Sequence, residues 1–238
     1  MEIAPGIYSL SQQEGGHVHA FLLDDGTELT VIDTLWDTDG QRILDQIKSI
    51  GRSVTDLKHI ILTHAHRSHL GGLAALKKAS GATVYAHEWE ADIISGERKA
   101  QGITVVPMRP LHLYLQVYPL QVGLALGFGQ HPPCPVDHYV TEGDKIGPIE
   151  VMHAAGHSPG HLSFYWQQKR ALFAGDAIAT WPEFAGGWYA FNLNEKQHQA
   201  TLNRMGDFDA EIVAVGHGDP ITTGGAERVR SLFTRTKW

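Results

Sequence analysis

The stretch THAHRSHLGG, residues 63–72, is the part of the sequence around which the fold is organised. It places three histidines, His64, His66 and His69, within six positions. The apolar run HIILT that leads into it predicts a buried strand, and residues 69–80 predict the helix that follows. The histidines therefore lie on a turn between a strand and a helix. Such a turn can direct two imidazoles at one point and the third at a neighbouring point, as a metal cluster requires.

More candidate ligands follow later apolar segments. The predicted strand at residues 149–155 leads into AAGHSPGH, ALFAG leads into an aspartate, and IVAVG leads into a histidine. The residues concerned are His157, His161, Asp176 and His217. Open α/β sheets bind ligands just beyond their strand ends, and a glycine before three of these residues permits tight turns there. The sequence therefore predicts that several strand ends converge on one site.

Composition describes an ordinary globular protein. The chain has 238 residues, of which 42% are hydrophobic and 19% charged, with a formal charge of −7. Nucleic-acid binding needs clustered basic residues, so this balance argues against such a partner. The single cysteine, Cys134, cannot form an internal disulfide, and the N-terminus has no apolar run typical of a signal peptide. We expect a cytoplasmic protein.

The remaining pattern predicts strands followed by helices, twice, without a flexible linker between the halves. Strands are expected at residues 6–10, 18–23, 29–33, 82–86, 138–146, 149–155, 162–166, 171–176 and 211–217. Helices are expected at residues 37–50, 87–95, 195–205 and 225–233. One α/β domain of two similar layers, spanning residues 1–238, is the economical interpretation.

Some polar residues in these elements have two interpretations. Asp33, at a strand end, either orients a ligand histidine or caps a turn. His17 and His19 flank Val18 and either face a pocket or form a polar strand face. His87 is expected on an exposed helix, without a functional role.

A long apolar segment at about residues 107–137 interrupts the succession of predicted strands and helices. No charged side chain occurs between Arg109 and Asp137. The run is long enough to span a membrane, but Pro119 and several polar residues and glycines argue against a spanning helix. We expect an insertion near the active site that serves as a lid or pocket wall. It could instead pack in the core or mediate a homodimer.

The order THxHxxHxGG, GHSPGH, FAGD and GHG closely resembles the metallo-β-lactamase superfamily over nearly the whole chain. That resemblance implies an αββα sandwich with a metal site at one edge of the sheets. It implies one metal on His64, His66 and His157, a second on His69 and His217, and Asp176 bridging both. His161 would lie nearby without being a ligand.

One position departs from the family pattern HxHxDH, because Ser68 replaces the aspartate. The second site thereby loses a negatively charged ligand and its proton carrier, so we expect it to bind metal more weakly. Zinc suits the ligand set, with one or two ions bound, and iron or manganese are also compatible. Arg67 either adds positive charge for an anionic substrate or faces solvent.

The expected chemistry is hydrolysis of a small ester, thioester, lactone or β-lactam by a metal-bound hydroxide. Asp176 would be catalytic, and Ser68, Tyr189 or His161 could replace the missing proton carrier. The substrate is expected to be partly apolar, because small-molecule pockets are mostly hydrophobic. The expected pocket residues are Arg67, Leu115, Phe128, Trp181, Phe184 and Trp188.

Two other functions fit the same residues. A mononuclear iron enzyme similar to persulfide dioxygenases of this fold would use His64, His157 and Asp176. A metal-binding protein with little catalysis, such as a ligand sensor, would fit the loss of the aspartate at Ser68. Metal content and turnover on a substrate panel discriminate among the three.

Overall fold

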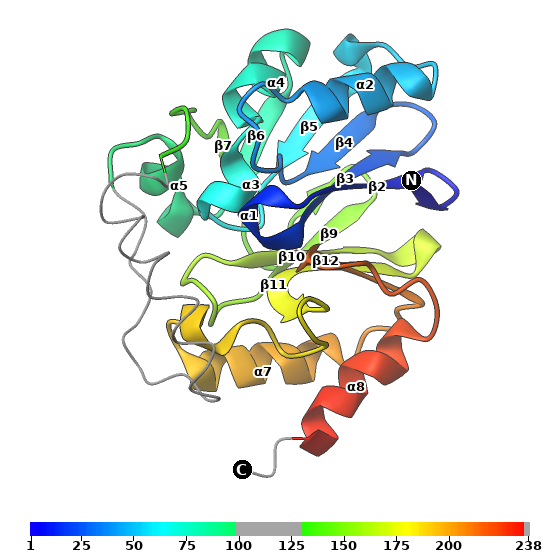
Figure 1. Ribbon diagram of the computed structural model, residues 1–238, viewed down its shortest axis with the longest axis vertical. Coiled ribbons are helices and arrows are strands. Elements are labelled where there is room, and N and C mark those ends of the chain that lie inside the picture. Colours follow the sequence, from blue (N-terminus) through cyan, green and yellow to red (C-terminus); the bar gives the residue numbers. More distant parts are fainter. Residues whose placement is uncertain (99–129, 236–238) are drawn as a thin grey trace.

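The computed structural model describes residues 1–98 and 130–235, and these form layers of helices and strands (Figure 1). The first half contains β1 (Glu2–Ala4), β2 (Ile7–Gln12), α1 (Glu14–His17), β3 (Val18–Asp24), β4 (Leu29–Ile32), α2 (Gln41–Ser49), η1 (Val54–Asp56), β5 (Leu57–Ile61), α3 (Arg67–Leu70), α4 (Leu73–Ser80), β6 (Thr83–Ala86) and α5 (Glu88–Ile94). The second half contains β7 (His138–Tyr139), β8 (Lys145–Ile146), β9 (Ile149–His153), β10 (Leu162–Trp166), η2 (Gln167–Lys169), β11 (Ala171–Ala179), η3 (Tyr189–Phe191), α7 (Glu195–Met205), β12 (Ile212–His217) and α8 (Gly225–Arg235).

The strands form two half-sheets that meet where β3 pairs with β12. The strand order is β7-β6-β5-β4-β3-β12-β11-β10-β9-β8, with β2 also paired to β3 and β1 to β2. Strands β4 to β7 run parallel, whereas β3 and β12 are antiparallel with Val18 opposite His217. Helices α2 and α4 cover one outer face, and α7 and α8 cover the other (Figure 1). This arrangement confirms the predicted αββα sandwich.

Strand β3 illustrates why the two half-sheets stack. Its residues are apolar almost throughout because both of its faces are buried. Ala20 and Leu22 point into the core beneath the first pair of helices, while Phe21 and Leu23 point into the core between the half-sheets. There Phe21 meets Phe173 of β11 edge-on, with ring centroids 5.5 Å apart. Because successive side chains of a strand point to opposite faces, β3 contributes to both cores.

The outer helices are held by apolar residues spaced three or four apart, which lie on one face of a helix. These buried pairs are Ile43 and Ile47 in α2, Leu73 and Leu76 in α4, Leu202 and Met205 in α7, and Val229 and Leu232 in α8.

Several elements differ from the expected boundaries, and the single strand expected at residues 138–146 is two short strands, β7 and β8. Helix α2 begins at Gln41 rather than residue 37, because Gly40 before it adopts a left-handed conformation with φ 65°. The helix expected at residues 69–80 is divided into α3 and α4 at Gly71, whose Cα lies against the carbonyl of Trp36 and leaves no room for a side chain. Strand β11 continues beyond Asp176 to Ala179, so this aspartate lies within a strand and not after it.

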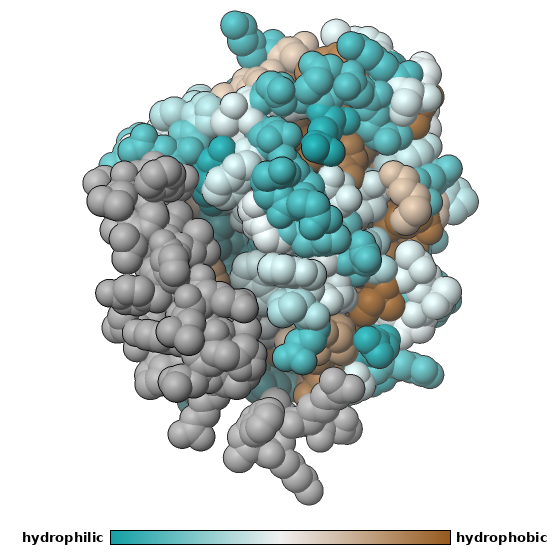
Figure 2. Space-filling view, viewed as in Figure 1, coloured by the Kyte–Doolittle hydropathy of each residue, from teal (hydrophilic) through white to brown (hydrophobic). Residues whose placement is uncertain are grey.

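The expected apolar insertion lies mostly outside the described residues. Leu115 and Phe128, and the question of lid, dimer contact or core, therefore fall outside the structure described. Its last residues return to the first core, where Cys134 is buried and its N–H donates to the carbonyl of Ile94 over 3.1 Å. None of the helices in residues 1–98 and 130–235 is long and apolar enough to cross a membrane. On the face drawn in Figure 2, hydrophobic side chains occur as small separate areas.

Candidate metal centre

The histidine motif lies between β5 and α4, at the end of the sandwich where α3 and α5 are found. His64 follows β5 by three residues, His66 precedes α3, and His69 lies within α3. The backbone of the motif is tied to the loop after β4, since the carbonyl of His69 accepts hydrogen bonds from Thr34 N at 2.8 Å and Thr34 Oγ1 at 2.7 Å. The turn is therefore rigidly attached to the first half-sheet.

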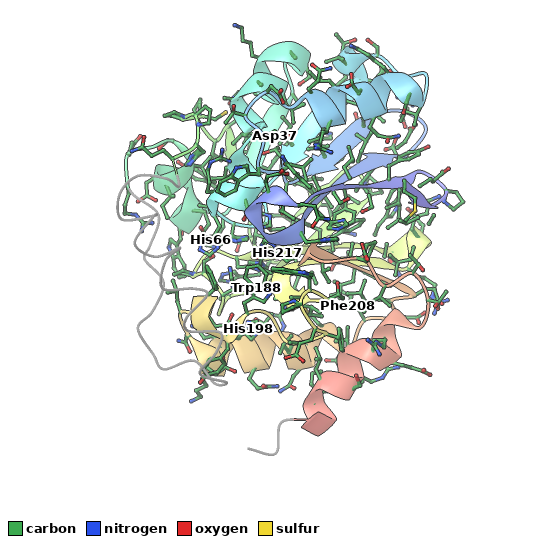
Figure 3. The ribbon with its side chains drawn as sticks, in the orientation of Figure 1. Asp37, His66, Trp188, His198, Phe208 and His217 are labelled. Atoms are coloured by element: carbon green, nitrogen blue, oxygen red, sulfur yellow. The ribbon has the colours of Figure 1, made fainter. Side chains whose placement is uncertain are left out.

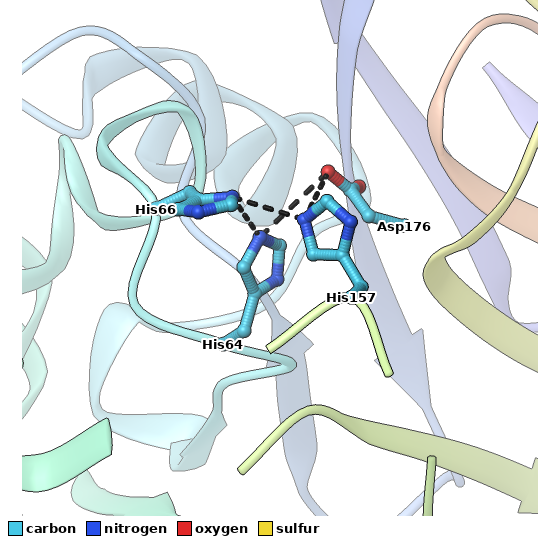
Figure 4. Close-up of side chains that lie close together, drawn as sticks. All are labelled: His64, His66, His157 and Asp176. Carbon is cyan, nitrogen blue, oxygen red and sulfur yellow. Dashed lines mark hydrogen bonds and ion pairs between the residues drawn. The ribbon is translucent and has the colours of Figure 1, made fainter. Parts of the chain in front are cut away.

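The first ligand group combines His64, His66, His157 and Asp176 (Figure 4). His66 Nδ1 lies 2.8 Å from His64 Nε2 and 3.0 Å from His157 Nε2. Asp176 Oδ2 lies 3.7 Å from His64 Nε2 and 3.5 Å from His157 Nε2. Ligands bound at about 2.1 Å to a tetrahedral ion are separated by about 3.4 Å, so these four atoms surround a space of about the right size.

The second group consists of His69, Asp176 and His217. Asp176 Oδ1 lies 3.3 Å from His69 Nε2, and Asp176 Oδ2 lies 3.2 Å from His217 Nε2. Asp176 belongs to both groups and is 5% exposed. A carboxylate in this position can join two neighbouring cations.

Hydrogen bonds orient the rings from behind. Asp33 Oδ2 accepts from His69 Nδ1 at 2.9 Å, and both oxygens of Asp33 accept from Thr63 at 2.8 Å. Asp33 therefore orients a histidine of the group and also secures the turn, which joins its two expected roles. The carbonyl of Gly16 accepts from His217 Nδ1 at 2.7 Å. Such contacts leave the other ring nitrogen of each histidine free for a metal.

His161 is buried beside the groups but has a different contact. Its Nε2 accepts a hydrogen bond from the backbone N–H of Asp176 at 3.1 Å. This contact holds the Asp176 backbone where its side chain faces both groups.

The histidines of the two groups differ in pKa: burial dominates in the first group, and neighbouring carboxylates dominate at His69. Burial lowers the pKa of His64 and His157 well below the usual value and lowers that of His66 to about 4, so these rings are neutral near pH 7. Burial would also lower the pKa of His69, but the carboxylates of Asp176 and Asp33 outweigh it and raise this pKa to about 10. A metal on His69 must therefore displace a proton.

For Asp176, burial alone would raise the pKa. The surrounding rings, first that of His217 and then those of His69 and His64, outweigh burial and hold the pKa of Asp176 well below its usual range. The carboxylate is therefore ionised, as a ligand must be.

The donor set fits bound metal ions. His69 Nε2 and Asp176 Oδ1 are buried and have no hydrogen-bond partner among the described residues. A buried polar atom without a partner costs free energy, and a cation between these two atoms would satisfy both. The neutral imidazoles of His64, His66 and His157 and the ionised carboxylate of Asp176 are also ligands that zinc and iron accept.

Ser68 and Tyr189, expected to carry protons, lie in different surroundings. Ser68 is buried in α3, between His66 and His69 in the sequence, and its Cβ lies against Gly15. Tyr189 is 49% exposed at the start of η3. Ser68 is fixed in place next to the second group, whereas Tyr189 extends into solvent.

Arg67 is held in place by backbone carbonyls of two neighbouring segments. Its Nη1 donates to the carbonyl of Trp36 at 2.7 Å and its Nε donates to the carbonyl of Gln130 at 2.8 Å. The guanidinium also lies 4.4 Å from the centre of the Trp36 ring. These contacts use the side chain to fasten the loop after β4 to residues 130–137.

The aromatic loop at residues 180–191 meets the second ligand group at His217, through the ring of Trp188 and the N–H of Thr180, which donates to the carbonyl of His217 at 3.0 Å. Trp188 stacks on His217, with ring centroids 4.2 Å apart and planes at 29°, and both lie at the centre of the molecule in Figure 3. Trp188 Nε1 donates to the carbonyl of Trp181 at 2.8 Å, and the Trp181 ring is 43% exposed. These two side chains form a wall beside the metal groups.

Phe184 differs from its expected position in a pocket wall. Its ring packs against the core beneath α7 and α8, and the guanidinium of Arg228 lies over it at 4.4 Å. The chain reverses at this point, because Ala185 pairs with Ala179 of β11, and Phe184 therefore turns toward the helices.

Glu90 is a residue of the site that the sequence pattern does not reveal. It lies in α5, is 3% exposed, and accepts hydrogen bonds from both ligand loops. Glu90 Oε2 accepts from Ala65 N at 3.0 Å, and Oε1 accepts from Ser158 Oγ at 2.6 Å and Gly160 N at 2.9 Å. The carboxylate thus joins the loop of His64 and His66 to that of His157. A lone glutamate on a helix carries no sequence signal for this.

Two further histidines are also structural. His87, expected on an exposed surface, is 5% exposed, because its Nδ1 caps α5 by accepting from Trp89 N at 3.2 Å and its ring stacks on His153. His198 of α7 donates from Nε2 to the carbonyl of Gly186 at 2.8 Å and so secures the aromatic loop to the helix.

Comparison with known sequences identifies related proteins. The family model described as the metallo-beta-lactamase superfamily matches residues 14–217. An uncharacterised protein, YobT, of Bacillus subtilis is 25% identical over 92% of this chain and 91% of its own. The probable metallo-hydrolase YflN of Bacillus subtilis is 26% identical over 93% of this chain and 87% of its own. A hydroxyacylglutathione hydrolase of Rhodobacter capsulatus is 26% identical over 79% of this chain and 59% of its own.

Solved structures show the same fold. The metallo-beta-lactamase family protein TTHA1429 of Thermus thermophilus superposes with a TM-score of 0.66 at 24% identity, covering 98% of this chain and 80% of that one. The protein TTHA1623 in a di-iron-bound form gives a TM-score of 0.65 at 25% identity, covering 96% and 98%.

Proposed function

The chain belongs to the metallo-β-lactamase superfamily, and from this membership we propose that it is a metal-dependent hydrolase of a small ester, thioester, lactone or β-lactam. The single observation that carries the proposal is Asp176, a buried and ionised carboxylate shared by two groups of histidines that face it. The names of YflN and of the Rhodobacter relative support hydrolysis in general. We propose that His64, His66 and His157 bind one ion, that His69 and His217 bind another, and that Asp176 contacts both.

A bound metal ion would lower the pKa of water and polarise a carbonyl group. The residues of the chain perform the remaining tasks. Asp33 and the Gly16 carbonyl orient His69 and His217, and Glu90 keeps the two ligand loops together. Trp188 and Trp181 would exclude water on one side and contact the apolar part of a substrate.

The experiment that tests this function measures metal content and hydrolysis in the same preparations. Protein purified without added metal is analysed by elemental mass spectrometry. It is then assayed on acetyl and octanoyl esters, a thioester, a lactone and a β-lactam, before and after chelation. Asp176→Asn is expected to lose at least 100-fold in kcat/KM on any accepted substrate, because both groups lose their shared charge. His138→Ala, which replaces an exposed histidine in β7, is the matched control and should retain full activity.

The alternatives give different results in the same experiment. One iron per chain, with oxygen consumption on a persulfide and no hydrolysis, would replace the proposal with the dioxygenase function. Bound metal with no turnover of any substrate would support a binding or sensing protein. Zinc with chelator-sensitive hydrolysis supports the proposed function, whereas hydrolysis that persists fully in Asp176→Asn contradicts it.

A further inference from the structure

A second cluster of metal-binding side chains lies outside the centre described above. It consists of His17 at the end of α1, His19 in β3 and Asp219 in the loop after β12, with potential ligand atoms all within 4.8 Å of one another. Asp219 Oδ1 lies 3.3 Å from His17 Nε2 and 3.9 Å from His19 Nε2. Two imidazoles and one carboxylate form a set typical of divalent transition metals.

The state of His19 is an independent sign of a ligand. The ring is 3% exposed, and its Nδ1 is paired with Ser9 Oγ at 2.8 Å. Its Nε2 is buried, is directed toward Asp219, and has no hydrogen-bond partner in the described part of the chain. With Nδ1 donating to Ser9, the lone pair of Nε2 faces a carboxylate oxygen, and a cation between them would give this buried nitrogen a partner.

His17 is the third residue of the cluster, and its backbone adopts an unfavourable conformation. Its φ of 54° lies in the left-handed region, which is uncommon for a residue other than glycine. Its Nδ1 can donate to Gln13 Oε1 at 3.3 Å, and its Nε2 points to Asp219. Asp219 is 87% exposed, so an ion in this position keeps open coordination positions for water.

The location suggests what such an ion does. His17 and His19 belong to the first half-sheet and Asp219 follows the last strand of the second, at the junction where Val18 pairs with His217. Around it Gly218 N donates to the carbonyl of His17 at 2.9 Å, and Thr180 Oγ1 donates to that of Asp219 at 2.7 Å. The neighbouring Gly16 carbonyl accepts from His217 Nδ1.

We propose that His17, His19 and Asp219 form an outer binding site for a divalent transition-metal ion, which links the two half-sheets at the β3–β12 junction. This site is separate from the centre at Asp176, since it shares no ligand with it. An ion here cross-links residues 202 positions apart in sequence and stabilises the backbone that orients His217.

Zinc binding to metal-free protein tests the proposal without reference to hydrolysis. Zinc is titrated in competition with a chromophoric chelator, and bound ions are counted by native mass spectrometry. We expect Asp219→Asn and His17→Asn each to bind one zinc fewer than the wild type, or to bind that ion at least tenfold more weakly. Asparagine tolerates the left-handed conformation of residue 17, and Asp219 is exposed, so both variants should fold. Asp207→Asn, with the same charge change at another exposed aspartate, is the matched control.

A main-site variant separates the two centres. His66→Ala should lose a different ion, and His66→Ala/Asp219→Asn should lose both. Zinc should also raise the melting temperature of His66→Ala, and this rise should be smaller in the double variant, which keeps only the group of His69, Asp176 and His217. Equal zinc binding by wild type, Asp219→Asn and His17→Asn overturns the proposal, as does loss of the same single ion in His66→Ala and Asp219→Asn.

Discussion

Ser68 occupies the position of the histidine motif at which the sequence resemblance leads us to expect an aspartate. It lies beside His69 in α3, where the second ligand group has three protein ligands, His69, Asp176 and His217. A carboxylate here would add charge next to a dication, so its replacement by a hydroxyl should make the second ion the weaker one.

Ser68→Asp is therefore expected to tighten binding of the second zinc ion at least tenfold. Ser68→Asn has the same size without the charge, and it should leave the affinity near that of the wild type. Zinc titration against a chromophoric chelator measures both. Two equally tight ions in the wild type would contradict the idea that Ser68 weakens the site.

Glu90 is a second single residue on which the metal centre depends, because its hydrogen bonds hold the ligand loops. In Glu90→Gln one carboxylate oxygen becomes an NH₂ group, so either Ala65 N–H or the donors from Ser158 and Gly160 lose their acceptor. We expect the free energy of unfolding to fall by about 1–3 kcal/mol and the affinity of the first ion to drop.

Urea unfolding of the metal-free protein and zinc titration provide the two measurements for Glu90→Gln. Glu88→Gln, on the exposed face of the same helix, is the control and should change neither quantity. Unchanged zinc affinity in Glu90→Gln would show that the ligand loops keep their positions without this carboxylate.

Among the elements, the loop at residues 180–191 links the metal centre to the outer helices. Trp188 stacks on His217 at one end of it, while Phe184 and the His198–Gly186 contact attach it to α7 and α8. The loop is therefore anchored on the helix side and presents an aromatic surface on the metal side.

Trp188→Ala is expected to raise KM for octanoyl esters at least fivefold more than for acetyl esters, because only the longer chain reaches the indole surface. Tyr139→Ala removes another exposed aromatic ring, from β7, and should leave the ratio unchanged. Steady-state kinetics give the KM of each variant for the two esters. An identical change for both esters would mean that Trp188 supports His217 without contacting the substrate.

Over the whole molecule, buried histidines make stability depend on pH. Burial lowers the pKa of His161 to about 3 and that of His66 to about 4, below the usual value of 6.5. Below pH 6.5 the unfolded chain binds protons that the folded chain does not, so the stability of the folded chain falls as pH decreases toward 4. His69 acts in the opposite direction, because its pKa of about 10 makes its contribution full below pH 6.5 and lost as pH rises through 10.

The metal-free protein should therefore be most stable near neutral pH. Urea unfolding in chelator at pH 4.5, 7 and 9.5 should give a lower free energy of unfolding at both extremes. Each buried histidine whose pKa is lowered contributes a slope of up to about 1.4 kcal/mol per pH unit below pH 6.5. His161→Gln should remove about one proton from the difference in protons bound by the unfolded and folded chains, and the slope should fall accordingly. A stability that stays constant from pH 7 to 4.5 would contradict the protonation states described for these rings.

The sequence by itself predicted one α/β domain of two similar layers with strand ends that converge on one site, and its family resemblance implied the αββα sandwich and the assignment of the metal ligands. This was feasible because the relevant signals are local. Apolar strands such as β3 and β5 reveal their burial by composition, and histidines that follow them within a few positions are brought to one edge of the sheet by the strand direction. Residues 195–205 likewise form the helix that their pattern predicts.

Only the tertiary structure decided how distant residues combine. Glu90 bonds to loops 25 and 70 residues away, and Asp219 meets His17 across 202 residues. Arg67 fastens a loop and Phe184 faces the helices, although both had been expected in the pocket. These contacts depend on which elements pack together and on which way a side chain turns. Neither the packing of distant elements nor the direction of a single side chain produces a periodic pattern in the sequence. A buried glutamate and an exposed glutamate are the same residue type.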